Sequence, residues 1–477
     1  MEGRLSRVAL VLTRVAERWL PDAFVFALAA TVVVFIAGLA IGVPAGDLVA
    51  SWGNGFGDLL AFAMQMSLVI VTGYVVATAR PVRRAIEAIA RLPRGPRGAV
   101  VTVAVFAMAS SWINWGFSLV FSAVLARAIA RRFAADGRRV DYRALAAASL
   151  LGLGSVWAQG LSGSAALQMA TPGALPPAIR AIIQNAGQTA RHNAGASGDG
   201  VPGGIVSFRH TVFLWQSLVS VAVEIVVVAL VMWRAAPSAA SARDAASLGI
   251  ALADPDEPEI APSTPGERIE HSPLLTLAVV ALGAAYLART FAGGLTTLTV
   301  NTINLALLIL GMLLHWTPAR LMRAVRAAVP ATWGVILQFP FYAAIAGMVA
   351  TTRLNDRIAH VFVSVSTARS FPALMAAYSA ALGVFVPSGG SKWIIEAPYV
   401  MKAAHQLHVH LGWVVACYDL GEAVANLVQP FWMLPVLALL GLRARDVMGY
   451  TFLVFLVLLP LVLVMTTLLG ATLAYPL

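Results

Sequence analysis

The sequence is poor in charged residues. Only 12% of its 477 residues are Asp, Glu, Lys or Arg, whereas soluble domains carry about 25%. Hydrophobic residues make up 59% of the chain, and the mean hydropathy is +0.81. This composition excludes an ordinary soluble domain and indicates a polytopic membrane protein, so that the lipid bilayer is its first expected partner.

Cysteine is almost absent as well. The single Cys417 excludes an internal disulfide, and we expect a packed thiol because this residue lies in an apolar segment. A cleavable signal peptide is also lacking, since the long apolar run after residue 22 has no small-residue cleavage site. Residues 1–22 contain four arginines and are predicted to form a cytoplasmic amphipathic lead.

The net charge of +11 comes from basic residues in scattered loops. In membrane proteins such residues mark cytoplasmic loops, so we expect no nucleic-acid partner. Following the arginines along the chain places the N-terminus inside and the C-terminus outside. Apolar runs long enough to cross a bilayer predict spans near residues 23–41, 59–79, 205–233, 274–291, 298–316, 332–351 and 450–473.

Two apolar segments fit hairpins better than spans. Residues 99–129 have arginines at both ends, so both ends should lie inside and the segment should enter the membrane and return. Residues 373–403 contain two short apolar arms joined by Pro387, Ser388, Gly389, Gly390 and Ser391. Backbone of this kind is tolerated at membrane depth only when it is buried in protein or lines a watery cavity.

Two further segments resemble broken helices. Residues 144–172 are interrupted by polar and small residues at 159–164, and residues 411–440 are interrupted around 419–430. The order of two spans, a hairpin, a broken helix and a further span therefore occurs twice along the chain. Gly116 and Gly389, at the two expected hairpin tips, are 273 positions apart, as are Gln65 and Gln338.

We therefore predict an all-α polytopic membrane protein with two inverted repeats, each containing a re-entrant helical hairpin and a broken helix, plus a linker span. The first repeat is predicted at 23–233 and the second at 298–477. A flexible cytoplasmic linker at 234–271 and the linker span at 272–297 separate them. Folds of this type place the substrate near the midplane, where the repeats meet.

The hairpin tips and helix breaks should converge on a binding site. Hydroxyls and helix N-termini hold a carboxylate, whereas carbonyls at unwound helix ends hold Na⁺. The predicted substrate-binding residues are Asn114, Trp115, Gly116, Ser118, Ser162, Ser164, Ser388, Gly389, Gly390, Ser391, Lys392 and Gln429. The predicted cation-coupling residues are Asp419, Glu422 and Asn426. No resident metal is expected, apart from Na⁺ at the hairpin tips.

Several of these residues have a second interpretation. Lys392 can pair with a substrate carboxylate or with Glu396, one turn further on. Asp419 and Glu422 can bind a cation, carry a proton or be held by neighbours. Glu224, within an apolar run, fits a structural pairing better than a functional role. Trp112, Trp115 and Trp393 fit ordinary packing or membrane anchoring as well as the wall of a substrate pocket.

Signals for other kinds of site are weak. His405, His408 and His410 fit a solvated loop better than a metal site. The sequence GLSGS at 160–164 has no preceding strand and no nearby histidine, which disfavours a hydrolase. No GxGxxG sequence occurs in a strand–helix setting, so a dinucleotide cofactor is not indicated.

Several longer motifs resemble one family. They are WGNGFGDLLAFAMQM at 52–66, INWGFSLV at 113–120, LQFPFYA at 337–343, VPSGG at 386–390 and VQPFW at 428–432. Together they look like the bacterial short-chain fatty acid transporters of the acetoacetate/butyrate (Ato) type, which belong to the ion-transporter superfamily. The chain departs from the family pattern at Ser391, at Lys392 and in the stretch GEAVANLVQP, which affects the role of Asn426.

The resemblance implies a secondary active transporter of the bacterial inner membrane rather than an enzyme. It implies cation-coupled symport of butyrate-like or acetoacetate-like monocarboxylates, with Na⁺ or H⁺ as the coupling ion and no cofactor. It also implies an elevator-type mechanism and a homodimer. Two alternatives are a Na⁺/H⁺ antiporter that uses Asp419 and Glu422, and an intramembrane enzyme that uses Ser162 or Ser164.

Overall fold

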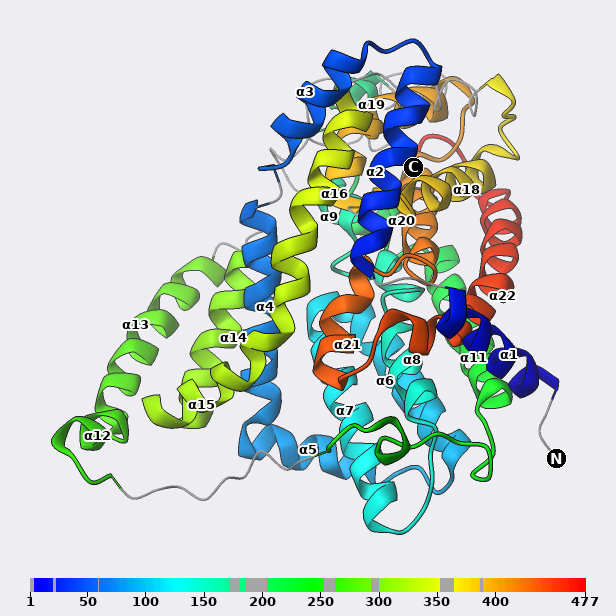
Figure 1. Ribbon diagram of the computed structural model, residues 1–477. Helices are drawn as coiled ribbons and strands as arrows, with labels where there is room; N and C mark the ends of the chain where they lie inside the picture. The colour runs from blue at the N-terminus through cyan, green and yellow to red at the C-terminus, as the bar shows by residue number, and fades with distance from the viewer. Residues whose placement is uncertain are drawn as a thin grey trace.

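The computed structural model describes residues 4–19, 23–58, 60–170, 180–185, 204–252, 262–292, 300–351, 364–386 and 389–477. Every regular element in these ranges is an α-helix or a 3-10 helix (Figure 1). The predicted all-α fold is therefore confirmed for the described part of the chain.

The long apolar runs form helices close to the predicted positions. They are α2 (Ala23–Ala40), α4 (Leu60–Thr78), α11 (Trp215–Ala235), α13 (Pro273–Phe291), α14 (Val300–His315), α16 (Trp333–Thr351) and α22 (Ala444–Gly470). Within the described ranges, five helices are long and apolar enough to cross a membrane, or six if the bent pair of α4 and α5 (Arg80–Ala90) counts as one. The chain is thus a multi-pass membrane protein.

The first predicted hairpin is formed by α6 (Pro96–Ile113) and α7 (Trp115–Ala135), which meet at Asn114. The two helices are antiparallel, because Arg132 near the end of α7 donates to the carbonyls of Ala90 and Pro93, just before α6. Close to the tip, Ser118 Oγ donates to the carbonyl of Ala107 at 2.7 Å. The hairpin is longer than the predicted 99–129, and its entry into the membrane from one side stays a prediction.

The second predicted hairpin is formed by α18 (Phe371–Gly383) and α19 (Gly389–Gln406). Lys392 Nζ on α19 donates to the carbonyl of Ser379 on α18 at 3.1 Å, so the two arms lie side by side. Pro387 and Ser388, which are predicted at the tip, lie outside the described residues.

Each predicted broken helix is interrupted. The first consists of α8 (Tyr142–Leu150), η1 (Val156–Gln159) and α9 (Ser164–Ala170), so its break runs from Leu151 to Gly163 and begins earlier than the predicted 159–164. The second consists of α20 (Leu411–Ala425), η7 (Phe431–Met433) and α21 (Leu434–Leu440). Its break begins at Asn426, so the prediction that Asp419 and Glu422 lie in unwound backbone is wrong. The helix tolerates both carboxylates because each has a partner inside the protein.

The helices fall into two groups. One group contains α2, α4, α13, α14 and α16, in which α14 packs on α4 and α13, and α16 packs on α2 and α4. The other contains both hairpins, both broken helices, α11 and α22. Figure 1 shows α13, α14 and α15 (Pro318–Ala328) at the side of the molecule opposite α1, α11 and α22. The two groups meet where α4 contacts α7 and where α16 contacts α21.

The N-terminal helix α1 (Arg4–Trp19) packs along α22. Its small residues are buried against that helix, and Gly449 allows the close approach, because a Cβ there would lie 2.2 Å from the backbone nitrogen of Thr13. The remaining short elements are α3 (Ala45–Gly55), α12 (Pro265–Glu270), η3 (Phe208–His210), η4 (Ala246–Leu248) and η6 (Val329–Thr332).

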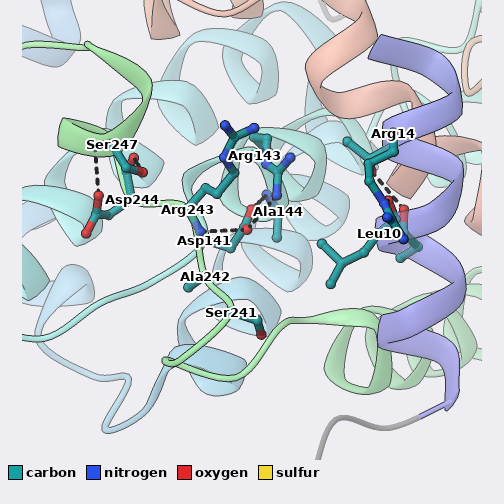
Figure 2. Close-up of polar contacts among 12 residues, drawn as sticks. Leu10, Arg14, Asp141, Arg143, Ala144, Ser241, Ala242, Arg243, Asp244 and Ser247 are labelled. Atoms are coloured by element: carbon teal, nitrogen blue, oxygen red, sulfur yellow. Dashed lines mark hydrogen bonds and ion pairs between the residues drawn. The ribbon is translucent and has the colours of Figure 1, made fainter. Parts of the chain in front are cut away.

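Part of the predicted linker is anchored to the start of α8 (Figure 2). The carboxylate of Asp141 accepts hydrogen bonds from the backbone of Ala144, from the Arg143 guanidinium and from the backbone of Arg243. Asp244 forms an ion pair with Arg139 at 3.1 Å. The linker therefore crosses this face of the protein along a defined path near Arg243, because its backbone and its side chains both have partners.

Candidate functional site

The tip of the first hairpin rests on the first helix break. Asn114 caps α7, because its side chain accepts a hydrogen bond from the Phe117 backbone at 2.9 Å. The backbone N–H of Trp115 donates to Ser162 Oγ at 3.0 Å. The backbone N–H of Leu161 donates to the carbonyl of Trp112 at 2.8 Å. Groups of the hairpin tip and of the helix break therefore hydrogen-bond to one another.

Asp419 on α20 caps the short helix α9. Its carboxylate accepts the backbone N–H of Ala165 at 3.0 Å and that of Ala166 at 3.2 Å, and its side chain has no exposed surface. A carboxylate at a helix N-terminus satisfies otherwise unpaired N–H groups and complements the positive end of the helix dipole. These two amide groups are therefore engaged by the protein itself.

The start of α19 lies against α9 and α20. A Cβ at Gly389 would lie 3.2 Å from Cγ of Glu422 and 3.4 Å from Ser164 Oγ. The next residue, Gly390, accepts a hydrogen bond on its carbonyl from Gln168 Nε2 at 3.0 Å. The start of α19 therefore approaches the break so closely that little room is left for a side chain at either glycine.

A buried ion pair joins α19 to α20. Lys392 Nζ contacts the carboxylate of Glu422, and these two residues are 3% and 0% exposed. Glu396 instead accepts hydrogen bonds from the hydroxyls of Tyr378 and Tyr418. Lys392 therefore pairs with Glu422 and not with Glu396, whereas its predicted pairing with a substrate carboxylate stays a prediction. Oε1 of Glu422 is buried and has no hydrogen-bond partner in the described part of the chain.

The second break also uses its polar groups internally. Asn426 Nδ2 donates to the carbonyl of Leu153 in the first broken helix at 3.1 Å. Gln429 Oε1 accepts from the backbone N–H of Phe431 at 2.7 Å. An aromatic contact also joins this break to the tip of the first hairpin. Trp432 packs edge-on against Trp115 with ring centroids 5.3 Å apart.

The structure brings some predicted site residues together and separates others. Those at the meeting of hairpins and breaks are Trp115, Ser162, Ser164, Gly389, Gly390, Lys392, Asp419 and Glu422. Gly116 instead lies against Val69, and Ser118 bonds within its own hairpin. Ser388 and the Ser391 side chain lie outside the described residues. Assignment of any of these residues to substrate or cation stays a prediction.

Sequence reasoning missed several buried amide groups. Gln168 binds the second hairpin, and Gln159 donates to Glu224 at 2.6 Å. Gln338 on α16 is 0% exposed, and neither of its amide atoms has a hydrogen-bond partner in the described ranges. An uncharged amide within a long apolar run is the available signal, because such a group needs a partner once it is buried.

The described residues include no group of three or more His, Cys, Asp or Glu side chains that could hold a metal ion. His410 caps α20, where its Nδ1 accepts from the backbone of Trp413 at 3.0 Å. Burial, with a further contribution from His210, lowers the pKa of this imidazole to about 4, so it is neutral near pH 7. Cys417 is fully buried, as expected of a packed thiol.

These features define a multi-pass membrane protein in which two helical hairpins meet two broken helices. A family model described as "Short chain fatty acid transporter" matches residues 4–469. The chain belongs to this family. It is therefore related to transporters and not to enzymes, which confirms the resemblance and removes the intramembrane enzyme from consideration.

Two bacterial relatives agree with this assignment. A protein of Escherichia coli (strain K12) is 37% identical over 453 residues, covering 94% of this chain and 96% of the relative. A protein of Haemophilus influenzae is 35% identical over 450 residues, again covering 94% and 96%. Both relatives are named short-chain fatty acid transporters, a function that is inferred for them.

Among solved structures, the chain is similar to the crystal structure of the Alcanivorax borkumensis YdaH transporter, which is described as having an unusual topology. The TM-score is 0.42 and the sequence identity is 15%, over 93% of this chain and 98% of the other. A likeness this weak carries no conclusion about fold or mechanism.

Proposed function

We propose that this protein takes up short-chain monocarboxylates, such as butyrate or acetoacetate, together with Na⁺ or H⁺. Membership of the transporter family supports the substrate class. A coupled cation would neutralise the carboxylate and so lower the cost of carrying it past the apolar barrier. The protein would lie in the bacterial inner membrane, with its N-terminus inside and its C-terminus outside.

One observation carries the location of the site: both hairpins contact the same short segment. Trp115 at the first tip binds Ser162, and Gly389 at the start of α19 lies against Ser164. Hydroxyls and backbone amides gathered at helix breaks are groups that can hold a carboxylate. The substrate anion would bind beside residues 162–164, in competition with the hydrogen bonds that these groups now make to one another.

The ion pair of Lys392 and Glu422 would adjust to the substrate. A carboxylate entering beside Gly389 would be attracted to Lys392, which would then be shared between the substrate and Glu422. This arrangement binds the anion, and the coupled cation needs a site of its own. Sharing Lys392 requires that neither residue of the pair move far, because the two side chains already touch.

The two helix groups support an elevator-type mechanism. The group that carries both hairpins and both broken helices would move as the transport unit, and the group of α2, α4, α13, α14 and α16 would remain as the scaffold. A homodimer formed through the scaffold would hold it in place in the bilayer.

The test uses purified protein in liposomes and labelled butyrate. Accumulation under an imposed Na⁺ or pH gradient is expected, with inhibition by unlabelled acetoacetate. Ser162→Ala should reduce the uptake rate about tenfold, because the Trp115 N–H loses its acceptor in the site. Cation exchange without any dependence on carboxylate would contradict the proposal and favour a Na⁺/H⁺ antiporter.

A further inference from the structure

Glu224 lies near the middle of α11 and has no exposed surface. Its Oε1 accepts hydrogen bonds from Gln159 Nε2 at 2.6 Å and from Ser220 Oγ at 3.0 Å. Its Oε2 is buried without a partner in the described residues, and so is Oε1 of Gln159. Both partners of this carboxyl group are neutral, so nothing in contact with it offsets a negative charge.

The elements packed against α11 are α1, α6, α22 and η1. Within the described ranges, none of their charged or titratable groups forms an ion pair or hydrogen bond with Glu224. These groups are Arg4, Arg7, Arg14, Glu17 and Arg18 on α1, Arg97 on α6, Arg445, Asp446 and Tyr450 on α22, and Arg234 on α11 itself. A buried carboxylate without a cation is costly, and the protonated acid avoids that cost.

The contact between Glu224 and Gln159 suits both forms of the acid. Its length of 2.6 Å is short for N–H···O and ordinary for O–H···O. The two ends of a glutamine amide have nearly the same shape and can exchange places. Gln159 can therefore donate to the carboxylate through Nε2, or accept through Oε1 from the protonated acid. Turning this amide would convert one arrangement into the other.

Gln159 is also connected to the proposed substrate site. It is the last residue of η1, directly before Gly160, and the break continues to Ser162 and Ser164. Gly160 is confined, because a Cβ there would lie 2.1 Å from the carbonyl oxygen of Trp112. A movement of Gln159 would therefore displace the closely packed backbone of residues 160–164. This segment contacts both hairpins.

We propose that Glu224 is the proton-binding site that couples the pH gradient to transport. The carboxylate takes up one proton from water on one side of the membrane and returns it to water on the other side. One proton then accompanies one monocarboxylate anion, and the cycle moves no net charge. This inference rests on the proposed function, because it assigns the coupling ion and its site.

The experiment compares Glu224→Gln with the unaltered protein in liposomes. Glutamine keeps the shape of the neutral acid but cannot exchange a proton. We expect butyrate counterflow, with butyrate on both sides and no pH gradient, to stay within about twofold of the unaltered rate. Accumulation driven by an inside-alkaline pH gradient should fall at least tenfold. Full pH-driven accumulation by the variant would overturn the proposal.

Two further measurements keep the outcome clear. Glu267→Gln, on the exposed helix α12, is the matched control and should leave both assays unchanged. If Glu224→Gln does not fold, Ser220→Ala should still shift the pH dependence of accumulation, because it removes one neutral partner; an unshifted profile would overturn the assignment. Accumulation that follows only a Na⁺ gradient would also overturn it. Absence of counterflow in the unaltered protein would instead contradict the proposed function.

A second, independent feature is a cavity of about 620 Å³ lined by Arg4, Arg97, Arg234, Leu5, Leu230 and Trp233. The three arginines come from α1, α6 and α11, at the ends that the arginine distribution places inside the cell. No described residue forms a hydrogen bond or an ion pair with any of their side chains. Leu230 and Trp233 are 48% and 46% exposed beside them.

We infer that this cavity binds the phosphate headgroup of an anionic phospholipid. Three unpaired guanidinium groups suit a phosphate, since arginine offers several donors in a planar fork. The exposed Leu230 and Trp233 suit an acyl chain entering from the bilayer. Basic cavities between membrane helices on the cytoplasmic side are known to hold anionic lipid headgroups. The apolar wall favours a lipid over a free phosphate.

Native mass spectrometry with added phosphatidylglycerol tests this inference. The unaltered protein should retain the lipid, and Arg4→Ala/Arg97→Ala/Arg234→Ala should lose about tenfold in occupancy. The control Arg80→Ala/Arg84→Ala/Arg91→Ala removes two basic residues of α5 and the one that follows it, all outside the cavity, and should retain the lipid. Equal retention by the first variant would overturn the lipid site. Complete displacement of the lipid by inorganic phosphate would overturn the choice of a lipid over a soluble anion.

Discussion

Gly389 shows how close the second hairpin comes to the first broken helix. A methyl group there would contact Ser164 and would require Glu422 to shift by a few tenths of an ångström. We predict that Gly389→Ala lowers butyrate uptake at least tenfold without lowering the amount of protein in the membrane. Gly46→Ala is the control, because a Cβ there meets nothing within 4 Å. Normal uptake by Gly389→Ala would mean that the contact is not needed.

Lys392 and Glu422 form a pair whose members depend on each other. Removing one partner of a buried ion pair typically costs about 3–5 kcal/mol, because the other charge remains buried. Lys392→Met should therefore lower the thermal unfolding temperature in detergent, and Lys392→Met/Glu422→Gln should restore much of the loss. A double variant no more stable than the single one would show that the two charges do not stabilise each other.

Long-range partners are what the sequence could not predict at this scale. Lys392 and Glu422 each stand out as charges in apolar segments. The local pattern, however, suggests Glu396 as the partner of Lys392 and gives no sign of a pairing with Glu422. Likewise, Glu224 and Gln159 are far apart along the chain and meet only because α11 packs on η1. Residue type indicates that a buried polar group needs a partner, whereas the partner depends on tertiary packing.

At the scale of elements, the linker gives a pH-dependent prediction. The Ser247 backbone N–H, together with the Ser247 hydroxyl and Arg139, holds the pKa of Asp244 below its ordinary value. A lowered folded-state pKa means that this anchor is fully formed above the unfolded value of about 3.9, and is lost as the pH falls through the folded pKa.

Hydrogen exchange of the linker checks this prediction, after correction for the intrinsic rate at each pH. Protection near Ser247 should be constant from pH 7 to about pH 5 and should fall below about pH 4, as Asp244 becomes protonated. Asp244→Asn should show the low protection throughout. Protection that is unchanged in the variant would mean that this carboxylate does not anchor the linker.

The helices themselves could largely be predicted from the sequence, because long apolar runs and interrupting Gly, Ser and Pro residues are local signals. The first break includes the predicted residues 159–163 for this reason, although it begins earlier, at Leu151. The second begins later than predicted, since Asp419 and Glu422 resemble an interruption but are held inside α20 by α9 and Lys392. Charged residues mark a break only when the fold supplies no partner for them.

At the scale of the whole molecule, the two helix groups predict which movements transport requires. A Cβ at Gly73 on α4 would lie 3.2 Å from Cβ of Val120 on α7, so these positions join the scaffold to the transport unit. A Gly73→Cys/Val120→Cys disulfide should abolish uptake and leave butyrate binding intact. Cys417→Ser in the background removes the native thiol.

The matched control joins two helices of the scaffold. A Cβ at Gly283 on α13 would lie 3.7 Å from Cβ of Ile309 on α14, a separation that suits a disulfide. Gly283→Cys/Ile309→Cys should crosslink and still transport. Equal uptake by both crosslinked variants would contradict an elevator movement between the two groups.

If the hairpins and the first helix break together form the substrate site, a crosslink between them must stop transport. A Cβ at Gly389 would lie 3.4 Å from Cβ of Ser164, close to the separation found in disulfides. In a Cys417→Ser background, Ser164→Cys/Gly389→Cys should form a disulfide on oxidation. The reduced variant should keep only the low butyrate uptake expected of a side chain at position 389, and oxidation should abolish what remains, reversibly on reduction. Failure to crosslink, or normal butyrate uptake by the crosslinked protein, would contradict the account.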